Sequence, residues 1–187
     1  MATAGYLPTV SGIRFNSGCG RTFDRRIIER VARERERTGR LVAVVGHSRG
    51  GQYARSLAAR YPDHVSHIVT LASAVEDPLD VSVLTERAAV MTRVALTRLD
   101  AERGTLGCLT NTCRCAFADG YRLPLPARVR FTTIYSRTDG VVRWPPCVAD
   151  YATCVEIPGS HFGMAFNRHA YRPIARALAV PPVARRV

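Results

Sequence analysis

Short apolar runs recur along the chain at the length of single strands. Leu41–Val45 is the most compact of them, and similar runs occupy Val65–Leu71, Arg130–Ser136 and Thr153–Ile157. Runs of this length, rich in Val, Ile and Thr and bounded by turn residues, favour strands buried in a sheet. The pattern therefore predicts at least four strands.

Apolar residues between these runs are spaced as on helices. The segment Thr22–Thr38 predicts a helix whose core face carries Phe23, Ile27, Ile28 and Val31. A second helix is expected from Gly51 to Tyr61, where Pro62 ends it. A final helix contains His169. Strands that alternate with helices indicate an α/β fold with a mostly parallel sheet and helices on both faces.

The passage from the first compact strand into its helix contains the sequence Gly46-His47-Ser48-Arg49-Gly50. A nucleophilic serine must stand on a turn so tight that the residues two before and two after it approach each other, which favours glycine at both. The pattern predicts a nucleophile elbow with Gly46, His47 and Gly50 around Ser48. An ordinary glycine-rich turn between strand and helix is the alternative.

A base and an acid follow in the order that such an elbow requires. Asp139 follows the strand-like run Arg130–Ser136, and His161 lies in a loop beyond Thr153–Ile157. The carboxyl ends of parallel strands share one edge of a sheet, so Ser48, Asp139 and His161 are expected to meet there. Asp77 is the alternative acid. Asp139 as a simple Asp-Gly turn residue, and His161 as a solvated loop residue, are the other interpretations left open.

These residue types fit acyl transfer. An imidazole takes the proton of the serine hydroxyl, and a carboxylate orients that imidazole and stabilises its charged form. The peptide N–H of Arg49, directly after Ser48 at the helix start, is the expected oxyanion donor. This chemistry requires no metal and no cofactor.

The segments Val45–Arg55, Tyr135–Trp144 and Gly159–Met164 together resemble the α/β-hydrolase superfamily, and especially small actinobacterial serine esterase and lipase-like proteins. The similarity is looser over most of residues 5–180. The resemblance implies one α/β-hydrolase domain over residues 1–187 with about five strands and a cap-like insertion at about 77–126. It also implies hydrolysis of a carboxylic ester or related acyl bond through an acyl-enzyme.

The chain departs from this family at its start. Tyr6–Phe15 resembles the family's fourth strand, while its first three strands have no counterpart. We expect either a truncated gene product or direct pairing of Tyr6–Phe15 with Leu41–Val45. An unpaired edge would favour self-association. The second oxyanion donor is not identifiable, and the glycine-rich loop Ser11–Gly20 is its nearest source.

Composition agrees with one globular domain. The 187 residues are 47% hydrophobic, and no run is long enough to span a membrane. The start of the chain lacks the features of a signal peptide, which predicts a cytoplasmic protein, or a secreted one if a leader has been lost. All 27 basic residues are arginine, giving a net charge of +12. They are scattered and partly interleaved with glutamates, so we do not expect nucleic-acid binding.

Cysteines and apolar residues mark the cap-like insertion. Cys108, Cys113 and Cys115 lack the second pair that a zinc site requires, so a disulfide or reduced thiols are expected there. Cys147 and Cys154 are a second candidate pair. Leu79–Leu99 predicts one or two amphipathic helices, and Arg103–Pro126 is expected to be irregular.

Three functions remain open from the sequence. The preferred one is a serine hydrolase acting on a small ester or a lipid acyl group. The second is a catalytically weak or inactive hydrolase-fold protein with a binding or structural role. The third is a basic protein that binds nucleic acid or a membrane surface.

Overall fold

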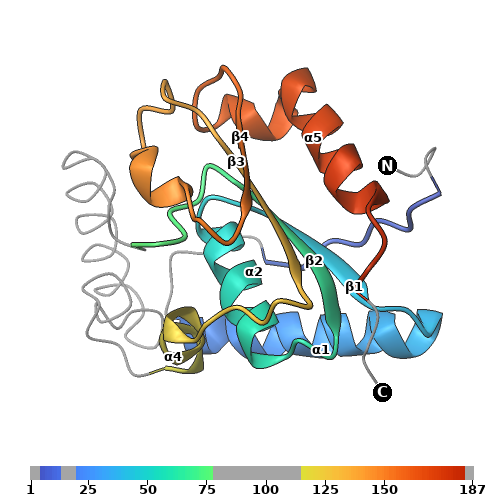
Figure 1. The fold of residues 1–187 in the computed structure, drawn as a ribbon. Coiled ribbons are helices and arrows are strands. Elements are labelled where there is room, and N and C mark those ends of the chain that lie inside the picture. Colours follow the sequence, from blue (N-terminus) through green and yellow to red (C-terminus); the bar gives the residue numbers. More distant parts are fainter. Residues whose placement is uncertain (1–4, 14–19, 78–114, 184–187) are drawn as a thin grey trace.

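A computed structural model describes residues 5–13, 20–77 and 115–183 (Figure 1). They form one four-stranded sheet in the order β1-β2-β3-β4, in which all neighbouring strands are parallel. The strands are β1 (Val42–His47), β2 (Val65–Leu71), β3 (Arg130–Tyr135) and β4 (Thr153–Glu156). All four apolar runs named above are therefore strands, and the predicted α/β fold with a mostly parallel sheet is confirmed.

Helices cover both faces of the sheet (Figure 1). The first face carries α1 (Gly20–Thr38), α2 (Arg49–Arg60) and α4 (Ala116–Arg122), whereas α5 (Arg168–Ala179) lies against the second. Two short 3-10 turns, η4 (Pro145–Cys147) and η5 (Gly163–Phe166), connect the later elements. The predicted end of α2 holds, because Tyr61 caps it directly before Pro62, but the helix begins at Arg49 rather than at Gly51.

The sheet separates two hydrophobic cores. Neighbouring residues of β2 alternate between them, with Ile68 in the core under α1, α2 and α4 and Val69 in the core under α5. Every residue of β2 is buried, as expected for an inner strand of a parallel sheet covered on both faces. Of the predicted core face of α1, Phe23, Ile27 and Val31 are buried, and Ile28 is partly buried against the same core.

Two sequence expectations are wrong in the described residues. Residues 5–13 form no strand and do not pair with β1, so the sheet has four described strands rather than about five. Part of Arg103–Pro126, expected to be irregular, is the helix α4. Its Phe117, Gly120 and Tyr121 are buried against α2, and this tertiary packing stabilises a helix too short to persist alone. The helices expected in Leu79–Leu99 lie outside the described residues.

None of the helices in the described ranges is long and apolar enough to cross a bilayer.

Candidate active site

Ser48 stands at the turn between β1 and α2 with an unusual backbone conformation. Its φ of 54° and ψ of −128° lie in a region that residues other than glycine rarely adopt. The Ser48 N–H donates to the carbonyl of Leu71 at 2.8 Å, and the Ser48 carbonyl accepts from Gly51 N–H at 2.9 Å. The turn is thus fixed to β2 on one side and to the helix start on the other.

The glycines around Ser48 have unequal roles. A Cβ on Gly46 would overlap the backbone of Gly50 and lie 2.5 Å from Gly51 N, so Gly46 must be glycine for the turn to close. The same requirement was predicted for Gly50, and this is wrong, because a Cβ there would meet nothing within 4 Å. Gly51 is a second constrained glycine, which was not expected from the sequence: its added Cβ would lie 2.8 Å from Ser73 Cβ and 3.0 Å from Thr70 Cβ.

Asp139 and His161 form a buried pair. His161 Nδ1 lies 2.9 Å from Asp139 Oδ2 and 3.0 Å from Oδ1, and the two residues are 3% and 6% exposed. Asp139 Oδ1 also accepts from the N–H groups of Val141 (2.9 Å) and Val142 (2.7 Å). Burial alone raises the pKa of Asp139, but the hydrogen bonds from His161, Val142 and Val141 outweigh it, so this pKa is lowered. The carboxylate therefore stays ionised against the imidazole.

The main chain of His161 is held on two sides. Its N–H donates to the carbonyl of Asp139 at 3.0 Å. Its carbonyl accepts from Nε2 of His47, the last residue of β1, at 2.8 Å, and the two imidazole rings are tilted with centroids 4.7 Å apart. From the sequence His47 was expected only as a neighbour of Ser48, since no local pattern reveals a partner 114 residues away.

The three candidate residues follow three strands at the same edge of the sheet. Ser48 comes directly after β1, Asp139 follows β3, and His161 follows β4. Among the described residues the ring of His161 hydrogen-bonds to Asp139 alone, so its Nε2 is not bonded to Ser48 Oγ. Free enzymes often have such a contact long or poorly aligned, and it tightens when substrate binds.

The predicted site residues Asp77, Arg49 and Cys154 make no contact with the Asp139–His161 pair among those that the structure describes. Asp77 is exposed, and Asp139 is the carboxylate that contacts His161. Arg49 begins α2, with its guanidinium 5.6 Å from the centroid of the Tyr53 ring. Cys154 has a free thiol that donates to Ala149 O at 3.4 Å, so the predicted pairing of Cys147 with Cys154 is wrong.

The remaining predicted cysteines belong to the cap-like insertion. Cys108 and Cys113 lie outside the described residues, and Cys115 is buried at the start of α4. Within residues 5–13, 20–77 and 115–183, no group of three or more His, Cys, Asp or Glu side chains is arranged to hold a metal ion.

Comparisons with known proteins agree with the fold. A family model described as the alpha/beta hydrolase fold matches residues 20–104. No curated protein matches the sequence. The lipase BlEst2 of Bacillus licheniformis in its mature form is a structural neighbour at 14% identity, over 84% of this chain and 73% of that chain, with a TM-score of 0.62.

Two further solved structures share the fold. The meta-cleavage product hydrolase from Pseudomonas fluorescens is 16% identical, over 89% of this chain and 73% of that chain, with a TM-score of 0.55. A serine hydrolase from Cycloclasticus zankles is 12% identical, over 91% of this chain and 75% of that chain, also with a TM-score of 0.55. The protein has the α/β-hydrolase fold.

Proposed function

We propose that the protein is a serine hydrolase of the esterase and lipase-like group, which cleaves a carboxylic ester or related acyl bond in a small molecule or lipid. Ser48 is the nucleophile, His161 the general base and Asp139 the acid that orients the imidazole. The observation that carries the proposal is the buried bridge from Asp139 to His161 Nδ1, at 2.9 Å, at the same sheet edge as the strained Ser48. A histidine with only a solvent-exposed loop role would not be buried against a carboxylate in this way.

The chemistry follows from the roles of the side chains. His161 Nε2 takes the proton of Ser48 Oγ as the oxygen attacks the acyl carbon, and the ionised Asp139 stabilises the imidazolium that results. The oxyanion is stabilised by the N–H of Arg49 at the start of α2. The imidazolium then protonates the leaving alcohol, and water releases the acyl group from Ser48 by the same steps in reverse.

A fluorophosphonate probe tests the nucleophile directly, because only an activated serine reacts with it. We expect the native chain to be labelled and Ser48→Ala to remain unlabelled. His161→Ala should be labelled at a rate lower by roughly a thousandfold or more, since triad members act as a unit. His64→Ala, at the opposite end of the sheet before β2, is the matched control and should react normally.

Hydrolysis of short p-nitrophenyl esters tests the reaction. Asp139→Asn should lower kcat by roughly ten-thousandfold in a chain that still folds, because the imidazole would be held in the wrong tautomer. A folded native chain that neither reacts with the probe nor releases p-nitrophenol would contradict the proposal, and would favour the hydrolase-fold binding protein instead.

A further inference from the structure

The outer side of α5 carries a row of arginines. Arg168, Arg172 and Arg176 are exposed and stand four residues apart, which places them about 6 Å apart along one side of the helix. The helix contains no acidic residue. Within the described part of the chain, none of the three side chains forms an ion pair or hydrogen bond with a carboxylate. Their charges are therefore available to an external anion.

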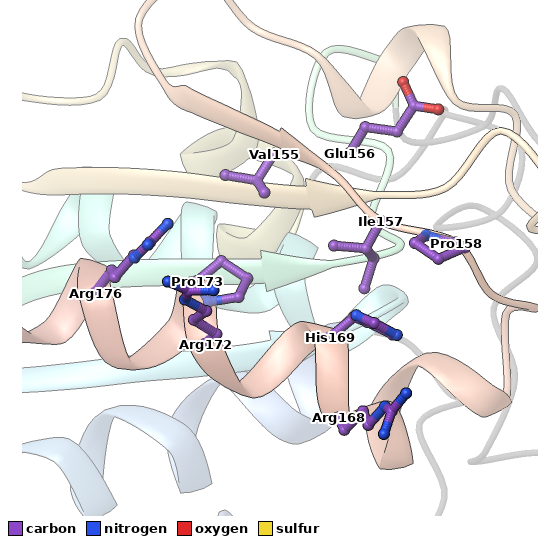
Figure 2. A pocket seen from close by; sticks show the side chains of 9 residues that line it. All are labelled: Val155, Glu156, Ile157, Pro158, Arg168, His169, Arg172, Pro173 and Arg176. Carbon is purple, nitrogen blue, oxygen red and sulfur yellow. The ribbon is translucent and has the colours of Figure 1, made fainter.

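These arginines border a groove between α5 and β4. The groove has a volume of about 370 Å³, and Figure 2 shows the α5 side chains along one side and the segment Val155–Pro158 along the other. Its apolar lining comes from Val155, Ile157, Pro158 and Pro173. Glu156 is the one acidic residue in this lining, and it is bound to Arg137 at 3.2 Å. Ser48, Asp139 and His161 do not line the groove, so it is separate from the candidate active site.

The loop that leads into α5 exposes two aromatic side chains. Phe162 is 76% exposed and Phe166 is 85% exposed, although Met164 between them is completely buried in the core under α5. The buried methionine fixes the loop to the body of the protein, so the two phenylalanines remain outside without a role in the core. Phe162 also lies edge-on to the ring of His161, with centroids 5.4 Å apart.

We propose that η5 and α5 form a docking surface for an anionic lipid membrane. Lipid phosphates bind to the arginines along the groove, and Phe162 and Phe166 enter the layer between headgroups and acyl chains. Arginine on a helix beside exposed aromatic side chains is the composition of segments that lie in a membrane interface. Because Phe162 touches His161, docking would also bring the sheet edge with Ser48 toward the membrane.

The exposed phenylalanines favour a lipid surface over nucleic acid. The arginines alone would attract any polyanion, and attraction of that kind weakens with salt and carries no requirement for an apolar side chain. Insertion of Phe166 into an acyl layer adds a hydrophobic contribution to the binding free energy, and salt does not screen this contribution. The two partners are thus separable by experiment.

Vesicle flotation of the intact chain tests the proposal, with phosphatidylcholine alone compared with an equal mixture of phosphatidylcholine and phosphatidylglycerol. We expect binding to the mixed vesicles only. Arg172→Gln and Arg176→Gln should each lower the coefficient for partition of the protein onto vesicles by about fivefold. Phe166→Ser should weaken it by at least as much, at low and at high salt.

Two control variants remove an arginine or an apolar side chain outside the proposed docking surface. Arg26→Gln on α1 removes an exposed arginine, and Val10→Ser removes an apolar side chain that is 80% exposed. Both should leave vesicle binding unchanged. Equal weakening by Arg26→Gln would show diffuse attraction by net charge and overturn the proposal. Tight binding of duplex DNA that needs Arg172 and Arg176 but not Phe166, without vesicle binding, would overturn it in favour of a nucleic-acid surface.

Discussion

Nε2 of His47 donates a hydrogen bond to the main-chain carbonyl of His161 at 2.8 Å, which ties the residue before Ser48 to the candidate base. Burial lowers the pKa of His47, the hydrogen bond to the His161 carbonyl raises it in part, and the nearby His161 ring lowers it further. The net effect keeps His47 neutral near pH 7, with its proton on Nε2 where the carbonyl requires it. The end of β1 and the loop after β4 are thereby held at a fixed separation.

Replacing His47 should impair turnover without removing the nucleophile. His47→Leu leaves the His161 carbonyl without its donor, which costs about 1–3 kcal/mol when the carbonyl stays buried. We expect kcat on p-nitrophenyl esters to fall by about tenfold or more, because His161 is displaced. KM should change little, because the residues that bind the substrate are unaltered. His47→Gln, whose amide can donate to the same carbonyl, should recover part of kcat. Equal loss in both variants would contradict a role through this hydrogen bond.

The three glycines of the elbow should respond differently to alanine. Gly46→Ala and Gly51→Ala force a Cβ into the backbone of Gly50 and into Ser73, so each should destabilise the fold by about 2 kcal/mol or more. Gly50→Ala should be neutral or stabilising by about 0.5–1 kcal/mol, since its Cβ meets open space on a helix. Urea denaturation of the three variants measures this. A loss at Gly50 as large as at Gly46 would show that the turn is tighter than described.

Sequence patterns predicted the elements that local chemistry determines. Apolar residues are spaced as in a strand along β1 to β4 and as in a helix along α1 and α2, and turn residues flank these segments. The order of Ser48, Asp139 and His161 placed all three at the carboxyl edge of the sheet before any contact was known. The strands and helices are recognisable within short windows of sequence, and each of the three site candidates is placed by the strand that it follows.

Features that depend on distant contacts were not predictable. Helix α4 persists because Phe117 and Tyr121 are buried and Gly120 lies against Ser56 and Arg60 of α2, none of which a short window of sequence reveals. The need for glycine at position 51 comes from Ser73, after β2. The strand expected at Tyr6–Phe15 came from family resemblance, and its described residues gain no ladder hydrogen bonds from β1.

Stability should fall on mild acidification because of two histidines, the half-buried His47 and the buried His67. Burial lowers the pKa of His47 and of His67, whose Nε2 lies 2.9 Å from the Val180 carbonyl. The folded state therefore binds fewer protons than the unfolded state, so stability is complete above the unfolded pKa of about 6.5 and is lost as pH falls below it. Urea midpoints between about pH 5 and pH 8 should show this slope.

The double variant His47→Gln, His67→Gln tests the source of that slope. We expect its urea midpoint to vary less with pH than that of the native chain, while the exposed His169→Gln control keeps the native profile. Asp139 adds a separate transition at lower pH: its lowered pKa contributes stability above about pH 4, which is lost as pH falls through the folded value. An unchanged slope in the double variant would assign the acid sensitivity to other groups.

The free side of β1 should allow the chain to associate with itself. Among the described residues β1 pairs only with β2, and Val45 on this edge strand is 45% exposed, so the unpaired N–H and C=O groups of the edge can receive a strand of a second copy. We expect concentration-dependent dimers by sedimentation velocity. Val45→Lys should abolish them, because a charge on the edge strand opposes strand pairing, whereas Leu123→Lys, which changes a similarly exposed residue (44%) beyond α4, should not. A native chain that stays monomeric at high concentration would show that the edge is protected, and equal loss in both variants would indicate association by a general apolar surface.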